Sequence, residues 1–277
     1  MKNLVVRALA GAIFVVIIVS GIYIHPYVFL SVFSLVIALT LWEFSGLLIQ
    51  YKNALPERLI DISGGVYLFF STFVYVNELS GKEIFLPYLF FLMYIFIAEF
   101  YRKDSNPINN WAYTLLGQIY CAGSFSLLNC IIFTPAVSGG VVFTPLFAFV
   151  LFAFVWLNDT SAYLVGSTMG KRRLFERISP KKSWEGFWGG LIVVLLSSQL
   201  FAYYIPDLSW YNWLGLSATV VLFATWGDLV ESLLKRTLTI KDSGHLIPGH
   251  GGMLDRLDSV LMAIPATYIY IELFIRN

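Results

Sequence analysis

The chain repeatedly runs for about 18 residues or more with almost no charged side chain, and this pattern constrains the fold most strongly. In lipid only helices and closed barrels satisfy their own backbone, and these runs are too continuous in Leu, Ile, Val and Phe for alternating barrel strands. We therefore predict an all-α polytopic integral membrane protein with about nine transmembrane helices. The predicted spans cover residues 4–24, 27–49, 60–78, 84–100, 111–133, 142–168, 185–205, 211–234 and 257–275.

The distribution of positive charge predicts the topology of these nine spans. All of the 18 Lys and Arg residues except Lys82 and Arg276 fall on one side of the predicted membrane. The positive-inside rule then places the N-terminus and the large polar loops in the cytoplasm. The formal net charge of +1 lacks the basic excess that nucleic-acid binding demands, so no nucleic-acid partner is expected.

The polar residues of the chain concentrate in its second half. No internal repeat, low-complexity segment or soluble region is apparent, so residues 1–277 are predicted to form a single membrane-embedded domain. Within it, residues 1–140 are expected to serve mainly as scaffold and lipid contact, and residues 141–277 as the catalytic half.

Carboxylates stand at the ends of the last two predicted helices. Asp228, Glu231, Ser232 and Lys235 are spaced to share one helical face, and Asp255 and Asp258 are three residues apart. A carboxylate near lipid needs a cation or a metal ion as partner, and hard oxygen ligands favour Mg²⁺. The alternative is a solvated charged loop, although such a loop does not need carboxylates at the ends of two apolar helices.

A glycine-rich loop lies between these carboxylates. Glycine amides approach phosphate groups closely, and Lys235, Arg236 and Lys241 stand nearby in the chain, so the stretch suits phosphoryl-type transfer. His245 and His250 lack a further ligand pattern for zinc, and a phosphate contact by His250 is the better interpretation.

A second polar stretch precedes the predicted span at 185–205. Ser179-Pro180 and Ser183 with Glu185 both resemble helix starts, which would put Lys181 and Lys182 near an anion-attracting helix N-terminus. A triphosphate is the ligand that this arrangement suits, and membrane anchoring is the alternative. Asp159 interrupts an apolar run and is a candidate functional residue or a buried interhelical hydrogen-bonding group, whereas Glu43, Glu99 and Glu272 receive less weight.

The stretch from Ser232 to Asp258 resembles the signature of the phosphatidate cytidylyltransferases, also called CDP-diacylglycerol synthases. The pattern of that family appears here as Ser232, Lys235-Arg236, Lys241-Asp242, Gly244, Pro248, His250-Gly251-Gly252 and Asp255-Arg256-Leu257-Asp258. The upstream stretches N-D-T-S-A-Y, S-P-K-K-S-W-E-G and G-D-L-V-E-S also look like that family, so the resemblance covers residues 156–258.

The resemblance implies a Mg²⁺-dependent enzyme that joins CTP to phosphatidic acid among membrane lipids, giving CDP-diacylglycerol and pyrophosphate, with a second metal ion left open. It implies a bacterial inner-membrane location with the active site at the cytoplasmic face. The metal-ligand and catalytic candidates are Asp228, Asp255 and Asp258, with Lys241 also catalytic. The substrate-binding candidates are Asp159, Lys181, Lys182, Ser183, Lys235, Arg236, His250, Gly251 and Gly252.

Two other functions remain open from the sequence. A CTP-dependent lipid kinase would use the same nucleotide and metal but release CDP. An anionic-solute transporter would use Asp159 and Asp228 in its path, but its polar residues should gather near the membrane midplane and not at one face. The sequence is compatible with a homodimer, and it assigns no residue to the selection of cytosine.

Overall fold

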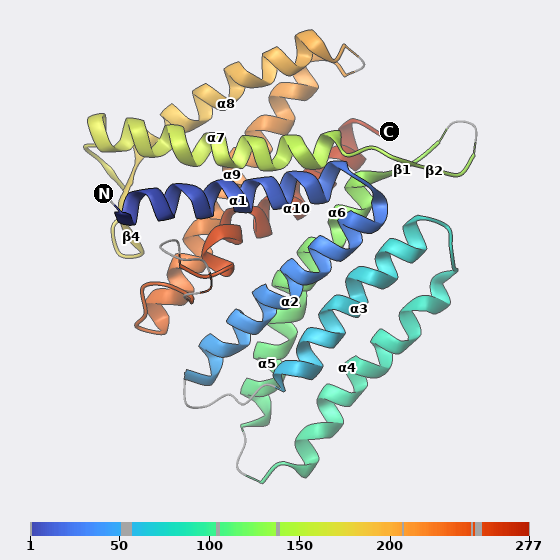
Figure 1. Ribbon diagram of the computed structural model, residues 1–277. Coiled ribbons are helices and arrows are strands. Elements are labelled where there is room, and N and C mark those ends of the chain that lie inside the picture. The colour runs from blue at the N-terminus through green and yellow to red at the C-terminus, as the bar shows by residue number, and fades with distance from the viewer. Residues whose placement is uncertain are drawn as a thin grey trace. The chain divides into compact units, whose positions relative to one another are not determined.

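The computed structural model describes residues 2–50, 57–103, 106–136, 139–206, 208–244, 246 and 251–276, with backbone alone for residues 2–7 and 50. Helices dominate this part of the chain (Figure 1). They are α1 (Lys2–Tyr23), α2 (Pro26–Gln50), α3 (Arg58–Val76), α4 (Leu86–Ala98), α5 (Pro107–Gly117), α6 (Ser124–Ile132), α7 (Leu146–Met169), α8 (Trp184–Tyr204), α9 (Trp210–Thr237) and α10 (Leu254–Phe274). The short strands are β1 (Phe133–Pro135), β2 (Val141–Phe143), β3 (Arg173–Phe175) and β4 (Ser179–Ser183).

The helices confirm the prediction of an all-α polytopic membrane protein. In the described residues, 8 helical segments are long and apolar enough to cross a membrane, and the part of α1 with described side chains, Ala8–Tyr23, is a further apolar segment. Two of these segments combine several elements. A π-helical stretch at Gln118–Gly123 joins α5 to α6, and 3₁₀ turns extend α4 at both ends, at Lys82–Phe85 and Glu99–Tyr101.

The chain divides into two compact units. Unit 1 comprises Met1–Pro145 and Leu238–Arg256, and unit 2 comprises Leu146–Thr237 and Leu257–Asn277. The boundary after Pro145 lies close to the predicted start of the catalytic half, but the loop segment Leu238–Arg256 belongs with the N-terminal spans. The functional division of the chain at residue 140 stays a prediction.

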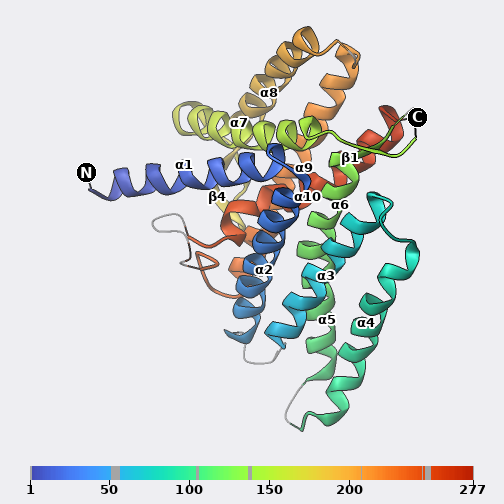
Figure 2. The same ribbon diagram turned by 45° about the vertical axis from the view of Figure 1, so that its right-hand side comes forward.

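In unit 1, α2 packs against α1, α3 and α5, while α3 also packs against α4 and α6. Figures 1 and 2 both show α3 and α4 side by side, joined by a short connection. Fully buried aromatic side chains fill the centre of the unit. The ring of Phe29 lies 4.9 Å from that of Phe33 and 5.5 Å from that of Phe69, measured between centroids. These large apolar side chains occupy the space between the helices.

In unit 2, α7, α8 and α9 pack against one another. Small residues allow α7 and α8 to approach closely, as is usual for helix pairs in membranes. A Cβ at Gly186 would lie 2.8 Å from the carbonyl oxygen of Ala162 and 3.2 Å from the Cα of Gly166. The close contact places the N-terminus of α8, with its polar residues, against the C-terminal half of α7.

The prediction of a helix start at Ser179-Pro180 is wrong. Ser179–Ser183 forms β4, which pairs antiparallel with β3 through Phe175 with Ser179 and Arg173 with Ser183. The hairpin pairing supplies hydrogen bonds that a local cap would otherwise provide, and α8 begins only at Trp184. The second predicted helix start, at Ser183 and Glu185, is confirmed, because Ser183 is the N-cap and its hydroxyl accepts from the Gly186 amide at 3.1 Å.

Candidate active site

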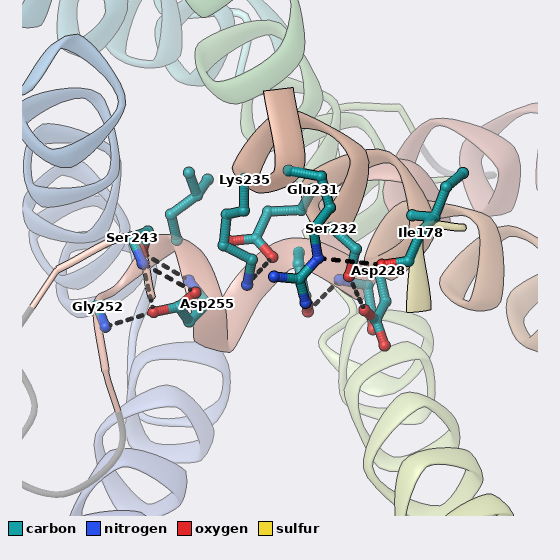
Figure 3. A network of polar contacts seen from close by, with 12 residues as sticks. Ile178, Asp228, Glu231, Ser232, Lys235, Ser243, Gly252 and Asp255 are labelled. Atoms are coloured by element: carbon teal, nitrogen blue, oxygen red, sulfur yellow. Dashed lines mark hydrogen bonds and ion pairs between the residues drawn. The ribbon is translucent and has the colours of Figure 1, made fainter. Parts of the chain in front are cut away.

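The polar candidates near the C-terminal end of α9 lie on one face of the helix, as their spacing predicts. The Ser232 hydroxyl donates to the Asp228 carboxylate at 3.2 Å, and the Lys235 ammonium pairs with the Glu231 carboxylate at 2.5 Å (Figure 3). Glu231 is fully buried, so its charge is separated from solvent and depends on the protein for stabilisation. The sequence placed Glu231 on this face among the carboxylates that need a cation, and the structure shows it as the ion-pair partner of Lys235.

A lysine from outside α9 reaches the same face. Lys182, in β4, forms an ion pair with Asp228. Lys181 beside it is exposed, so neighbouring lysines in the S-P-K-K stretch have different surroundings. The sequence suggested both lysines as anion contacts, but it did not indicate which carboxylate either one meets.

Asp258 adds a residue of α10 to this group. It lies within electrostatic range of Asp228 and Glu231 on α9 and of Asp159 on α7, all within unit 2. The backbone amide of Ser259 donates to the Asp258 carboxylate at 2.6 Å. We define the acidic centre as Asp159, Asp228, Glu231 and Asp258, and its lysine partners as Lys182 and Lys235.

Gly227 allows α9 and α10 to bring the acidic centre together. A Cβ at Gly227 would lie 2.5 Å from the carbonyl oxygen of Asp258 and 3.1 Å from the Cα of Ser259. Both neighbours are backbone atoms of α10, so no side-chain rotation can make room. The helices must separate if any other residue stands at this position.

Replacing Gly227 by alanine is therefore expected to destabilise the protein by about 1–3 kcal/mol, the usual cost of overpacking. Displacement of α10 also moves Asp258 relative to Asp228, so activity should fall as well. The melting temperature in detergent and the turnover rate measure the two effects. Gly123→Ala is the control, because the nearest atom to its Cβ is 3.4 Å away, and an equal loss of stability in both variants would contradict the packing argument.

The polar start of α8 organises the segment before it. The Glu185 carboxylate accepts from the backbone amides of Lys171 at 3.0 Å and Arg172 at 3.1 Å. The Arg236 side chain donates through Nε to the carbonyl of Ile178 at 3.3 Å, which joins the end of α9 to the β3–β4 hairpin. The sequence placed Glu185 at a helix start, and its contacts show that it also fixes the backbone leading into the hairpin.

The glycine-rich loop in unit 1 is held by Asp255. Its carboxylate accepts from the Ser243 amide at 2.9 Å and from the Gly252 amide at 2.8 Å (Figure 3). Gly251 has a φ of +86°, and a Cβ there would lie 2.5 Å from the Asp255 carboxylate. Glycine is required at position 251 both for this backbone conformation and for the close approach of the carboxylate.

Glu43 is the residue that sequence reasoning underestimated most. It stands in the middle of α2 and is only 8% exposed. Its carboxylate accepts from the Leu254 amide at 2.9 Å and from the Ser243 hydroxyl at 3.4 Å, so it contacts the start of α10 and the loop before it. The only signal in the sequence was an acidic residue inside an apolar span, which is costly without a partner.

Among the remaining candidate residues of the glycine-rich loop, the structure describes Lys241 and Gly252. Lys241 is exposed and Gly252 is buried on the same loop. His250 lies outside the described residues, so its predicted phosphate contact stays a prediction. Asp255 belongs to unit 1, whereas Asp228 and Asp258 belong to unit 2, so a metal site shared by all three also stays a prediction.

The acidic centre fits a hard divalent cation in chemical type, since all its donors are carboxylate oxygens. As the described side chains stand, no group of three or more His, Cys, Asp or Glu is arranged to hold an ion. Mg²⁺ does not need such a group, because it is usually bound by one or two carboxylates together with water and substrate phosphates. Asp228 on α9 and Asp258 on α10 are two carboxylates of this kind on neighbouring helices.

The chain is similar in sequence to several named proteins. A phosphatidate cytidylyltransferase of Haemophilus influenzae is 30% identical over an alignment 287 residues long, which covers 95% of this chain and 97% of that protein. Proteins of the same name from Staphylococcus epidermidis and Staphylococcus aureus are 48% and 47% identical over 121 residues, about 42% of this chain and 46% of each relative. The family model of the cytidylyltransferases matches residues 5–274. The chain therefore belongs to the cytidylyltransferase family.

Proposed function

We propose that this protein is a phosphatidate cytidylyltransferase, which transfers the CMP group of CTP to phosphatidic acid and releases pyrophosphate. The observation that carries the proposal is the acidic centre of unit 2, where Lys182 pairs with Asp228 and Lys235 pairs with Glu231, within electrostatic range of Asp258. Such a centre is costly next to lipid and suits a polyphosphate with a cation. The relatives that carry this name, one of them matching along nearly its whole length, support the same reaction.

In the proposed reaction a phosphate oxygen of phosphatidic acid attacks the α-phosphorus of CTP. A new P–O bond forms as the bond from the α-phosphorus to the bridging oxygen breaks, and pyrophosphate leaves with that electron pair. A phosphomonoester has a second pKa of about 6, so the nucleophile is already anionic at neutral pH. No side chain then needs to remove a proton from it.

The lysines are proposed to neutralise the phosphates. Lys182 and Lys235 each pair with a carboxylate in the structure, so their ammonium groups are held in place before substrate arrives. Pre-positioned charge costs little reorganisation during the reaction. Lys181, Arg236 and Lys241 are the further proposed phosphate contacts. The proposed substrate-binding set also includes Asp159, Ser183, His250, Gly251 and Gly252.

Asp228 and Asp258 are proposed to hold Mg²⁺, with Asp255 as a third ligand. When bound, the ion would neutralise charge on the phosphate oxygens. The Ser232 hydroxyl orients the Asp228 carboxylate, and the Ser259 amide orients that of Asp258. Hydrogen bonds of this kind fix the direction in which a ligand presents its oxygens.

The proposed location is the inner membrane of a bacterium, with the N-terminus and the active site facing the cytoplasm. The relatives are bacterial proteins, and the Lys and Arg residues favour this orientation. CTP would arrive from the cytoplasm, while the acyl chains of phosphatidic acid remain in the bilayer. Single cysteines introduced at Lys82 and Lys103 test the orientation, because only the former should react with a membrane-impermeant thiol reagent added from outside the cell.

The reaction itself is tested with the purified protein, phosphatidic acid, Mg²⁺ and each of the four nucleoside triphosphates. We expect pyrophosphate and CDP-diacylglycerol to form with CTP. Release of CDP with a phosphorylated lipid would identify a lipid kinase. Uptake of an anion into sealed vesicles without nucleotide consumption would identify a transporter, and either result would overturn the proposal.

A further inference from the structure

A pocket in unit 1 opens between α2, the start of α3 and the glycine-rich loop. Its volume is about 410 Å³, and Trp42, Glu43, Arg58, Ser243 and Gly244 are among the residues that line it. This volume lies within the usual range of small-molecule sites, about 300–1,000 Å³. All the lining residues belong to unit 1, so the pocket does not depend on how the two units are placed.

Glu43 lines this pocket, and one oxygen of its carboxylate lacks a partner among the described residues. One oxygen of the carboxylate, Oε2, accepts from the Leu254 amide and the Ser243 hydroxyl. The other oxygen, Oε1, is buried and has no hydrogen-bond partner among the residues that the structure describes. The Glu43 side chain is 92% buried, and a buried acceptor without a donor costs free energy. A ligand that donates a hydrogen bond to this oxygen would remove that cost.

Arg58 supplies donors on another wall of the pocket. Its guanidinium carbon lies 4.8 Å from the centroid of the Trp42 ring, a cation–π contact. A Cβ at Gly46 would lie 2.5 Å from Nη2 of Arg58, so the glycine leaves space for the guanidinium against α2. The Nε of Arg58 is buried and has no partner in the described part of the chain. The ring and the glycine therefore hold an arginine in place without using all its donors.

An acceptor and a fixed donor between aromatic and aliphatic walls suit a small planar heterocycle. They do not suit a phosphate group, because the unpartnered carboxylate oxygen would repel it. Cytosine presents an exocyclic amine that donates and a ring carbonyl that accepts, and carboxylates are known to accept from this amine. Lys241, a proposed phosphate contact, stands only two residues before Ser243 on the same loop.

We propose that this pocket holds the cytosine base of CTP, with Glu43 accepting from the exocyclic amine and Arg58 donating to the ring carbonyl. The inference rests on the proposed function, which supplies CTP as the substrate. Uracil carries a carbonyl oxygen where cytosine carries the amine, so UTP would place an acceptor against the carboxylate. A site built around a hydrogen bond rejects an analogue that cannot make it much more strongly than an apolar pocket would.

The test is Glu43→Gln, measured as the ratio of kcat/KM for CTP to that for UTP at saturating phosphatidic acid. The glutamine carbonyl can still accept from Leu254, while its amide group replaces Oε1 with a donor that pairs with uracil. We expect the ratio to fall roughly tenfold or more, the size of the discrimination that one well-placed polar contact to a base provides. A variant that keeps the ratio of the wild-type protein overturns the inference.

Glu272→Gln is the matched control, because Glu272 pairs with Arg276 in unit 2 and lines no part of this pocket. It should leave the ratio unchanged. If Glu43→Gln does not fold, Arg58→Leu provides the test of the inference. In that variant the KM for CTP should rise roughly tenfold or more because a base contact is lost. The KM for phosphatidic acid should stay the same. Equal changes in both KM values would overturn the inference.

Pyrophosphate release by the wild-type protein distinguishes a failure of this inference from a failure of the proposed function. A wild-type protein that releases no pyrophosphate from CTP removes the proposed function and this inference together. A wild-type protein that prefers CTP, combined with an unchanged preference in Glu43→Gln, removes only the assignment of the pocket.

Discussion

Asp228→Asn is expected to lower kcat by about 10²–10³-fold, the usual loss when one pre-positioned electrostatic group is removed from an active site. Asparagine has nearly the same shape and can still accept from the Ser232 hydroxyl, so the helix should be undisturbed. It removes the charge that pairs with Lys182 and that belongs to the acidic centre. Pyrophosphate release from CTP and phosphatidic acid measures the effect.

The control removes one negative charge elsewhere in the same unit. Glu176 is exposed in the turn between β3 and β4, and Glu176→Gln should retain full activity. Melting temperatures of both variants in detergent should match that of the wild-type protein. An Asp228→Asn protein that folds and keeps more than a tenth of wild-type activity would exclude Asp228 from the chemistry.

Local spacing predicted part of this site correctly. Asp228, Glu231, Ser232 and Lys235 share one face because helical geometry alone fixes positions three and four residues apart. The approximate limits of the spans followed from the length of the apolar runs for the same reason, since each helix satisfies its own backbone. Neither inference required knowledge of what packs against the helix.

Contacts between distant segments were not predictable in this way. The ion pair of Lys182 with Asp228 joins residues 46 positions apart, and the hydrogen bond of Glu43 joins it to Leu254, 211 positions away. Spacing within one helix contains no information on such pairs. Glu43 therefore received little weight, although an acidic side chain inside an apolar span already implied a partner.

The error at Ser179-Pro180 has a related cause. Serine followed by proline is favourable at a helix start, but the same residues also fit the edge of a short hairpin. Pairing of β4 with β3 decides between the two, and the sequence of Ser179–Ser183 alone does not contain that pairing. Tertiary contacts override a weak local preference in this stretch.

The second large effect is expected for Asp255→Ala, which should lower activity at least about 100-fold by releasing the glycine-rich loop. The Asp255 carboxylate holds the amides of Ser243 and Gly252 with charge-assisted hydrogen bonds. Each such bond contributes about 1.5–3 kcal/mol, so hydrogen exchange at the two amides should accelerate about tenfold or more when the carboxylate is lost. Exchange measured by mass spectrometry on peptides that contain residues 243 and 252 reports this directly.

Asp258→Ala is the matched comparison, because Asp258 stands one helical turn further along α10 and accepts from the Ser259 amide instead. It should also lose activity, but exchange at the Ser243 and Gly252 amides should stay at the wild-type rate. The pair of variants thus separates a carboxylate that organises the loop from one that acts only in the acidic centre. If exchange at the two amides is the same in Asp255→Ala as in the wild-type protein, the loop is held by other contacts, and the loss of activity must come from the proposed metal ligation alone.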